Sequence, residues 1–149
     1  MAGLLIIAHA PLASALREVG LHAFADAAPS VAALDVGRDM SPEQIESKVA
    51  ALLALVRQPE ALILVDVFGA TPCNVAQRLA DGREVRLVAG VNVPMLWRVL
   101  GYRDRPIDQL VELALSGGAQ GVLVAASSRP QAQPVKTAGH EEKQHHHQQ

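Results

Sequence analysis

The sequence predicts an α/β fold, an open three-layer sandwich with a mostly parallel sheet, and three observations support this prediction. Short apolar runs rich in Leu, Val and Ile recur along the chain. Segments in which apolar residues recur at helical spacing separate these runs. Most runs are followed directly by polar residues, Gly or Pro. Strands that alternate with helices in this way favour parallel pairing with helices on both faces of the sheet.

Strands are expected at five apolar runs. The first, residues 3–8 (GLLIIA), shows no alternation of polar and apolar residues, which is typical of a strand buried on both faces. The other four runs cover residues 31–36, 61–65, 85–89 and 121–125.

Helices are expected between these strands. The first is predicted over residues 11–28, with Pro11 in its first turn. The second begins at a capping box, with Ser41 as N-cap, and ends near Arg57. The third has Thr71 as N-cap and ends near residue 80.

Two further helices are predicted in the last third of the folded part. One covers residues 95–100 and follows Asn92 and a proline. The other covers residues 106–115, and Gly117 and Gly118 are expected to stop it, because glycine is common just after a helix C-terminus.

Composition restricts the domain organisation and the partners. The chain has 149 residues, half of them hydrophobic, which is enough for one domain. We expect this domain at residues 1–126 and a flexible polar tail at residues 127–149. A formal net charge of -2 and only 3% aromatic residues argue against nucleic acid as a partner.

The chain is expected to be cytoplasmic. Its single cysteine, Cys73, excludes an intrachain disulfide and is read as a small buried residue. The N-terminus lacks the basic region of a signal peptide. The apolar stretch at residues 61–70 is about half as long as a bilayer requires and contains Asp66, so no membrane insertion is expected.

The candidate site lies where the predicted strands end. His9 follows the first strand, Asp66 the third and Asn92 the fourth, and the carboxyl ends of parallel strands share one edge, where ligands collect. A carboxylate that accepts from one imidazole nitrogen leaves the other free to attack an electrophile. His9 and Asp66 are therefore candidate catalytic residues.

A phosphoryl group is the electrophile for which the following turn is suited. Gly69, Ala70 and Thr71 precede or begin a helix, whose free amide groups and dipole favour an anion. The helix near Pro11 is expected to offer a second positive end. No cofactor or metal is expected in the folded part, and His140 and residues 145–147 are assigned no native role.

Other interpretations stay open at this point. His9 can be a structural residue, and Asp66 can be a loop carboxylate that caps a turn. A hydrolase that uses both residues on water is weaker, because the chain has no nucleophile elbow, no metal-ligand spacing and no Walker loop.

The same residues resemble the mannose/fructose-type IIA domains of the bacterial sugar phosphotransferase system. The resemblance covers residues 1–126. It rests on a first strand that ends at His9, on LVDVFGATPCN at residues 64–74, on AGVNVPML at residues 89–96 and on a late GVLV strand. Two departures are Ala70 and Thr71 where the family often has Gly and Ser, and Ala10-Pro11 directly after the histidine.

The resemblance implies a phosphocarrier. His9 would accept a phosphoryl group from the carrier protein HPr and pass it to a IIB domain, with Asp66 as acidic partner and Thr71 beside the phosphoryl group. It also implies a homodimer in which the strand at residues 121–125 is exchanged, running antiparallel. Alternatives of the same class are a regulatory phosphoprotein that controls an effector and the phosphotransfer subunit of dihydroxyacetone kinases.

Overall fold

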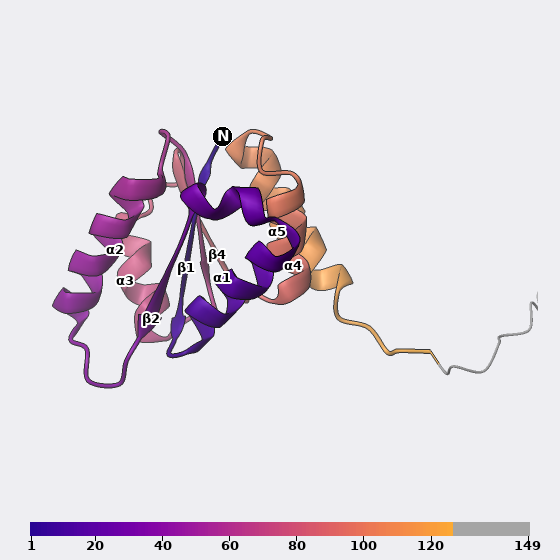
Figure 1. Ribbon diagram of the computed structural model, residues 1–149. Coiled ribbons are helices and arrows are strands. Elements are labelled where there is room, and N and C mark those ends of the chain that lie inside the picture. Colours follow the sequence, from indigo (N-terminus) through magenta and orange to yellow (C-terminus); the bar gives the residue numbers. More distant parts are fainter. Residues whose placement is uncertain (127–149) are drawn as a thin grey trace, which may run out of the picture.

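A computed structural model describes residues 1–126 of the chain (Figure 1). The expected tail at residues 127–149 lies outside the described residues. The described elements follow the order β1 (Gly3–His9), α1 (Leu12–Ala23), η1 (Ala25–Ser30), β2 (Val31–Val36), α2 (Pro42–Val56), β3 (Ala61–Val65), α3 (Thr71–Leu79), β4 (Val85–Ala89), α4 (Val93–Gly101) and α5 (Ile107–Gln120).

The four described strands form one all-parallel sheet in the order β2-β1-β3-β4, which confirms the predicted fold class. The chain moves from β1 outward to β2 on one side and then returns to place β3 on the other side of β1. The direction of winding therefore reverses between β1 and β3. In open α/β sheets this switch point, at the carboxyl ends of the strands, is where ligands bind.

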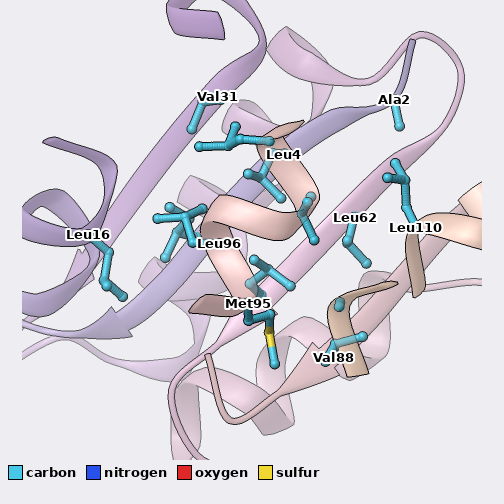
Figure 2. Packing of buried hydrophobic residues seen from close by; sticks show 14 of the residues in the cluster. Ala2, Leu4, Leu16, Val31, Leu62, Val88, Met95, Leu96 and Leu110 are labelled. Carbon is cyan, nitrogen blue, oxygen red and sulfur yellow. The ribbon is translucent and has the colours of Figure 1, made fainter. Parts of the chain in front are cut away.

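Helices cover both faces of the sheet, with α2 and α3 on one side and α1, α4 and α5 on the other (Figure 1). Successive residues of β1 point to opposite faces, so Leu4 and Ile6 pack with α4 and α5 while Leu5 and Ile7 pack with α2. Figure 2 shows the first of these layers, in which Leu96 and Met95 of α4 lie over the sheet. The core is aliphatic on both faces.

Helix α2 begins as its sequence predicts. The Ser41 side chain accepts a hydrogen bond from the Gln44 amide at 3.1 Å, and the Gln44 side chain accepts one from the Ser41 amide at 2.9 Å. The helix ends at Val56, one residue before Arg57. The predicted capping box is therefore confirmed.

The first predicted helix is too long. Helix α1 ends at Ala23, because Phe24 leaves the helical region with φ -132° and ψ 63°. A 3-10 helix, Ala25–Ser30, with Pro29 inside it, fills the rest of the predicted span.

The predicted end of the last helix is wrong, because α5 continues through Gly117 and Gly118 to Gln120. The two glycines are packing residues. A Cβ at Gly117 would lie 2.8 Å from the Cβ of Arg98, and one at Gly118 would lie 2.8 Å from the Cε of Met95. The absent side chains let α5 approach α4 closely.

The strand predicted at residues 121–125 is also wrong for the single chain. Gly121 follows α5 in a turn, and residues 122–126 have no sheet partner among the described residues. A strand needs a neighbour for its backbone donors and acceptors, and this segment leads away from the sheet (Figure 1). The antiparallel strand and its exchange between subunits are not shown. None of the described helices is long and apolar enough to span a bilayer.

Candidate functional site

The order of the strands brings His9 and Asp66 together. Strands β1 and β3 are neighbours, with Ile7 opposite Val65, so His9 at the end of β1 lies beside the residue that follows β3. The Asp66 Oδ2 atom accepts two hydrogen bonds from His9, one from its backbone amide at 3.0 Å and one from its ring Nδ1 at 2.7 Å. The expected pair therefore exists at the topological switch point.

Asp66 is held on both carboxylate oxygens. Its Oδ1 accepts a hydrogen bond from the Val67 amide at 2.9 Å, and its side chain is only 12% exposed. Burial by itself raises the pKa of the Asp66 carboxyl, but the hydrogen bonds from His9 and Val67 outweigh burial and hold that pKa below its ordinary value of 3.8. Asp66 is thus an ionised acceptor near neutral pH.

This charge state fixes the proton on the imidazole ring. An ionised carboxylate can only accept hydrogen bonds, so the His9 Nδ1 atom must carry the hydrogen that it donates to Asp66. In the neutral ring the lone pair then lies on Nε2. The His9 side chain is 56% exposed, which leaves Nε2 accessible to a partner.

An open pocket of about 390 Å³ lies beside the His9 ring. Strand β1, the connection after β2 and the first turn of α3 provide its walls. The residues that line it are His9, Ala10, Val36, Gly37, Arg38, Met40, Ile45, Thr71 and Pro72.

The turn before α3 lies as the sequence suggested, shifted by one residue. Thr71 was expected to be the N-cap, but the N-cap is Ala70 and Thr71 is the first helical residue. Within residues 1–126, no side chain caps this helix end. Gly69 has φ 90°, a conformation that glycine adopts without strain, and Thr71 lines the pocket. The α3 N-terminus therefore presents uncapped amides and a hydroxyl near His9.

The second expected positive helix end is already paired with an anion. Asp35 of β2 accepts hydrogen bonds from the amide and the hydroxyl of Ser14, at 2.9 Å and 2.5 Å. Ser14 lies in the first turn of α1, so Asp35 caps this helix from a neighbouring strand. The peptide bond between Ala10 and Pro11, just before α1, is cis.

Asn92, which the sequence places at the same edge of the sheet as His9, has a structural role. Its Oδ1 accepts a hydrogen bond from the Met95 amide at 2.9 Å, and its Nδ2 donates to the Gly118 carbonyl at 3.1 Å. Asn92 is thus the N-cap of α4 and ties this helix to α5. It does not line the pocket beside His9.

Arg38 is a charged pocket residue that the sequence analysis does not single out. It lies in the connection after β2. The register places Val36 opposite His9, so this connection starts beside the histidine. Within residues 1–126, no three His, Cys, Asp or Glu side chains gather closely enough to hold a metal ion.

The fold and this site together define a class: an α/β protein that presents an exposed histidine, oriented by a carboxylate, at the switch point of a parallel sheet. Residues 3–113 match the family described as PTS system fructose IIA component. The chain therefore belongs to the mannose/fructose IIA family of the sugar phosphotransferase system, whose members transfer phosphoryl groups.

Two curated relatives have names from the same system. The mannose-specific EIIAB component of Escherichia coli strain K12 is 38% identical over 97 residues, which are 63% of this chain and 28% of that protein. The fructose-specific EIIA component of Bacillus subtilis strain 168 is 42% identical over 55 residues, which are 36% of this chain and 38% of that protein. The matches thus span well under half the length of either relative.

Solved structures confirm the fold. The mannose/sorbose specific IIA subunit from Enterococcus faecalis superposes with a TM-score of 0.77 at 22% identity, over 88% of this chain and 98% of that chain. The phosphotransferase system component EIIA from Streptococcus agalactiae gives a TM-score of 0.71 at 23% identity, over 83% of this chain and 97% of that chain.

Proposed function

We propose that the protein is a phosphocarrier that accepts a phosphoryl group from phospho-HPr on Nε2 of His9 and passes it to a IIB domain. The observation that supports this most directly is the 2.7 Å hydrogen bond between His9 Nδ1 and Asp66 Oδ2. It occupies one ring nitrogen and leaves the other as the nucleophile. Family membership supports phosphoryl transfer in general.

The transfer balances without a net proton change. The Nε2 lone pair of His9 attacks the phosphorus atom of the donor's phosphohistidine, and a nitrogen–phosphorus bond forms. The donor's nitrogen–phosphorus bond breaks, and its electron pair stays on the donor ring. The His9 ring then carries positive charge with its hydrogen still on Nδ1, which the ionised Asp66 stabilises. Transfer onward to a IIB domain is the same step in which His9 is the donor.

The pocket supports an anionic group at Nε2. A phosphoryl group adds a charge of about -1.5 to -2 near neutral pH. The uncapped first turn of α3 and the Thr71 hydroxyl supply donors on one wall of the pocket. We assign phosphate binding to Thr71 and to the backbone of Gly69 and Ala70.

The surface near the site suits protein partners. Val67 and Phe68 directly follow Asp66, and they are 48% and 73% exposed. Aromatic side chains are enriched in protein interfaces and favour burial against a partner. A phosphoryl donor and acceptor that are both proteins would cover this loop when they reach His9, and we place this exchange in the cytoplasm.

A homodimer is part of the proposal. Val122, Leu123 and Val124 are 75%, 73% and 94% exposed, although such residues are usually buried. Strand β4 ends the described sheet, so its outer edge has no partner within residues 1–126. We propose that residues 121–125 pair with the β4 edge of a second copy, running antiparallel to it.

Phosphotransfer with purified components tests the carrier function. The wild-type chain should take one phosphoryl group from phosphoenolpyruvate through enzyme I and HPr, and a IIB domain should drain it. The His9→Ala variant should take none, while His22→Ala, which changes a histidine on α1, should behave as wild type. A labelled His9→Ala variant would refute the proposal. Label that stays on His9 in the presence of IIB domains but changes binding to an effector would favour a regulatory phosphoprotein instead.

A further inference from the structure

We propose that Arg38 is a phosphoryl-binding residue of this pocket. It would neutralise the phosphoryl group on His9 from the side opposite α3. This inference deepens the proposed function and rests on it. The ligand class is a phosphoryl or phosphate dianion.

The place of Arg38 follows from strand register. His9 pairs with Val36 in the parallel ladder between β1 and β2, and the Ala10 amide donates to the Val36 carbonyl at 3.0 Å. Arg38 is two residues beyond Val36, in a turn where the Met40 amide donates to the Gly37 carbonyl at 3.3 Å. The turn therefore starts beside His9, and it holds Arg38 at the rim of the pocket.

The negative charge around the pocket favours a cation at the position of Arg38. Among the described residues that line the pocket, Arg38 is the one Lys or Arg. The carboxylate nearest His9 is Asp66, and Asp35 occupies the start of α1, so both add negative charge to this edge of the sheet. A dianion on His9 would be repelled by these groups, and without Arg38 only the α3 amides and the Thr71 hydroxyl would offset this repulsion.

Arg38 is available for this role. Four other arginines, Arg57, Arg78, Arg86 and Arg103, form ion pairs with carboxylates. Arg38 forms no ion pair with another residue of the described part, and its side chain is exposed. A guanidinium group offers five donors in a planar fork that matches phosphate oxygens.

Arg83 provides a matched control. It is also exposed and forms no ion pair within residues 1–126. It precedes β4, so it lies at the amino edge of the sheet, whereas Arg38 follows the carboxyl end of β2. Loss of Arg83 changes the net charge by the same amount without changing the pocket.

Inorganic phosphate is the probe that tests Arg38. The full chain, labelled with ¹⁵N, is titrated with phosphate while the Thr71 amide and the Arg38 Nε–H are followed by NMR. We expect the Kd for phosphate to rise about tenfold or more in Arg38→Gln, because charge-assisted hydrogen bonds are lost. In Arg38→Lys the Kd should rise only about threefold, since lysine keeps the positive charge but lacks the planar set of guanidinium donors. Arg83→Gln should match the wild type.

The outcomes separate the two proposals. An unchanged Kd in Arg38→Gln, an equal loss in Arg83→Gln, or no phosphate binding by the wild type would each overturn the role of Arg38. Phosphate binding that depends on Arg38, together with a His9 that accepts no phosphoryl group from HPr, would leave the anion site standing and refute the carrier function.

Discussion

The Asp66 carboxylate accepts two hydrogen bonds from a single residue, the backbone amide of His9 at 3.0 Å and the His9 Nδ1 atom at 2.7 Å. The first bond fixes the end of β1 against the loop after β3, and the second orients the ring that β1 carries. Position and protonation of the histidine therefore depend on one side chain. The charge of that side chain is the first thing to test.

Replacement of Asp66 by Asn should slow phosphorylation of His9. The neutral amide no longer stabilises positive charge on the ring and can donate to Nδ1 instead, which would move the ring hydrogen to Nε2. We expect the initial rate of labelling from phospho-HPr to fall about tenfold to a hundredfold, the value of one charge-assisted hydrogen bond. Asp104→Asn, at an exposed aspartate without an ion pair in the described part, is the control. Equal rates in wild type and Asp66→Asn would contradict the role of Asp66.

The pH dependence of stability has a definite sign. Because the folded-state pKa of Asp66 lies below 3.8, its ionised form stabilises the fold fully above pH 3.8. That contribution is lost as the pH falls through the lower folded-state pKa. The difference in unfolding free energy between wild type and Asp66→Asn should thus shrink as the pH falls below 3.8. Urea unfolding at a series of pH values measures it.

A direct titration supplies the control for this pH dependence. In His9→Ala the side-chain hydrogen bond to Asp66 is lost, so the pKa of Asp66 should rise in a ¹³C carboxyl titration. The pKa of Asp81 is also lowered, chiefly by hydrogen bonds from the Val85 and Arg83 amides, and should stay unchanged. A shift of both carboxyls would point to a general change in the fold.

The four strands of the described sheet and the His9–Asp66 pair could be predicted from the sequence, because they depend on local pattern and on one rule of parallel sheets. Continuous apolar runs define the strands, and residues at their carboxyl ends meet. The strand order is not visible in the sequence. For that reason the sequence does not single out Arg38, although the connection that carries it starts beside His9.

The errors have physical causes of the same kind. Gly117 and Gly118 look like a helix stop because glycine often follows a helix, but here they give α4 room to pack. Asp35 and Asn92 act as caps for helices, and only tertiary structure shows which amide each one meets. The apolar run at residues 121–125 has the composition of a strand, but it finds no sheet partner within the part of the chain that the structure describes.

The glycine contact between α4 and α5 can be tested by Gly117→Ala. In an open helix this change would stabilise the protein, because alanine favours the helix by about 1 kcal/mol. Here the new Cβ would lie 2.8 Å from the Arg98 Cβ, so we expect a net loss of about 1–3 kcal/mol from overpacking. Gly101→Ala, whose Cβ would meet only Phe24 at 3.6 Å, should not destabilise. Urea unfolding compares the two, and equal effects would contradict the packing argument.

The proposed dimer can be tested with charges on its exposed segment. Leu123→Asp and Val124→Asp should each convert the dimer into a monomer in sedimentation velocity. Burial of an unpaired carboxylate in the interface would cost free energy and so weaken the pairing of this strand. Val67→Asp changes the loop after β3, beside His9, and should leave the dimer intact. A monomeric wild type at micromolar concentration would refute strand exchange.

The measurement that tests the central claim most directly is the identity of the phosphorylated atom. The chain is phosphorylated through HPr with ¹⁵N-labelled histidine, and the nitrogen–phosphorus coupling is read by NMR. The account predicts coupling at Nε2 of His9, with the Nδ1 hydrogen retained and bonded to Asp66. A phosphoryl group on Nδ1, or on any residue other than His9, would contradict it.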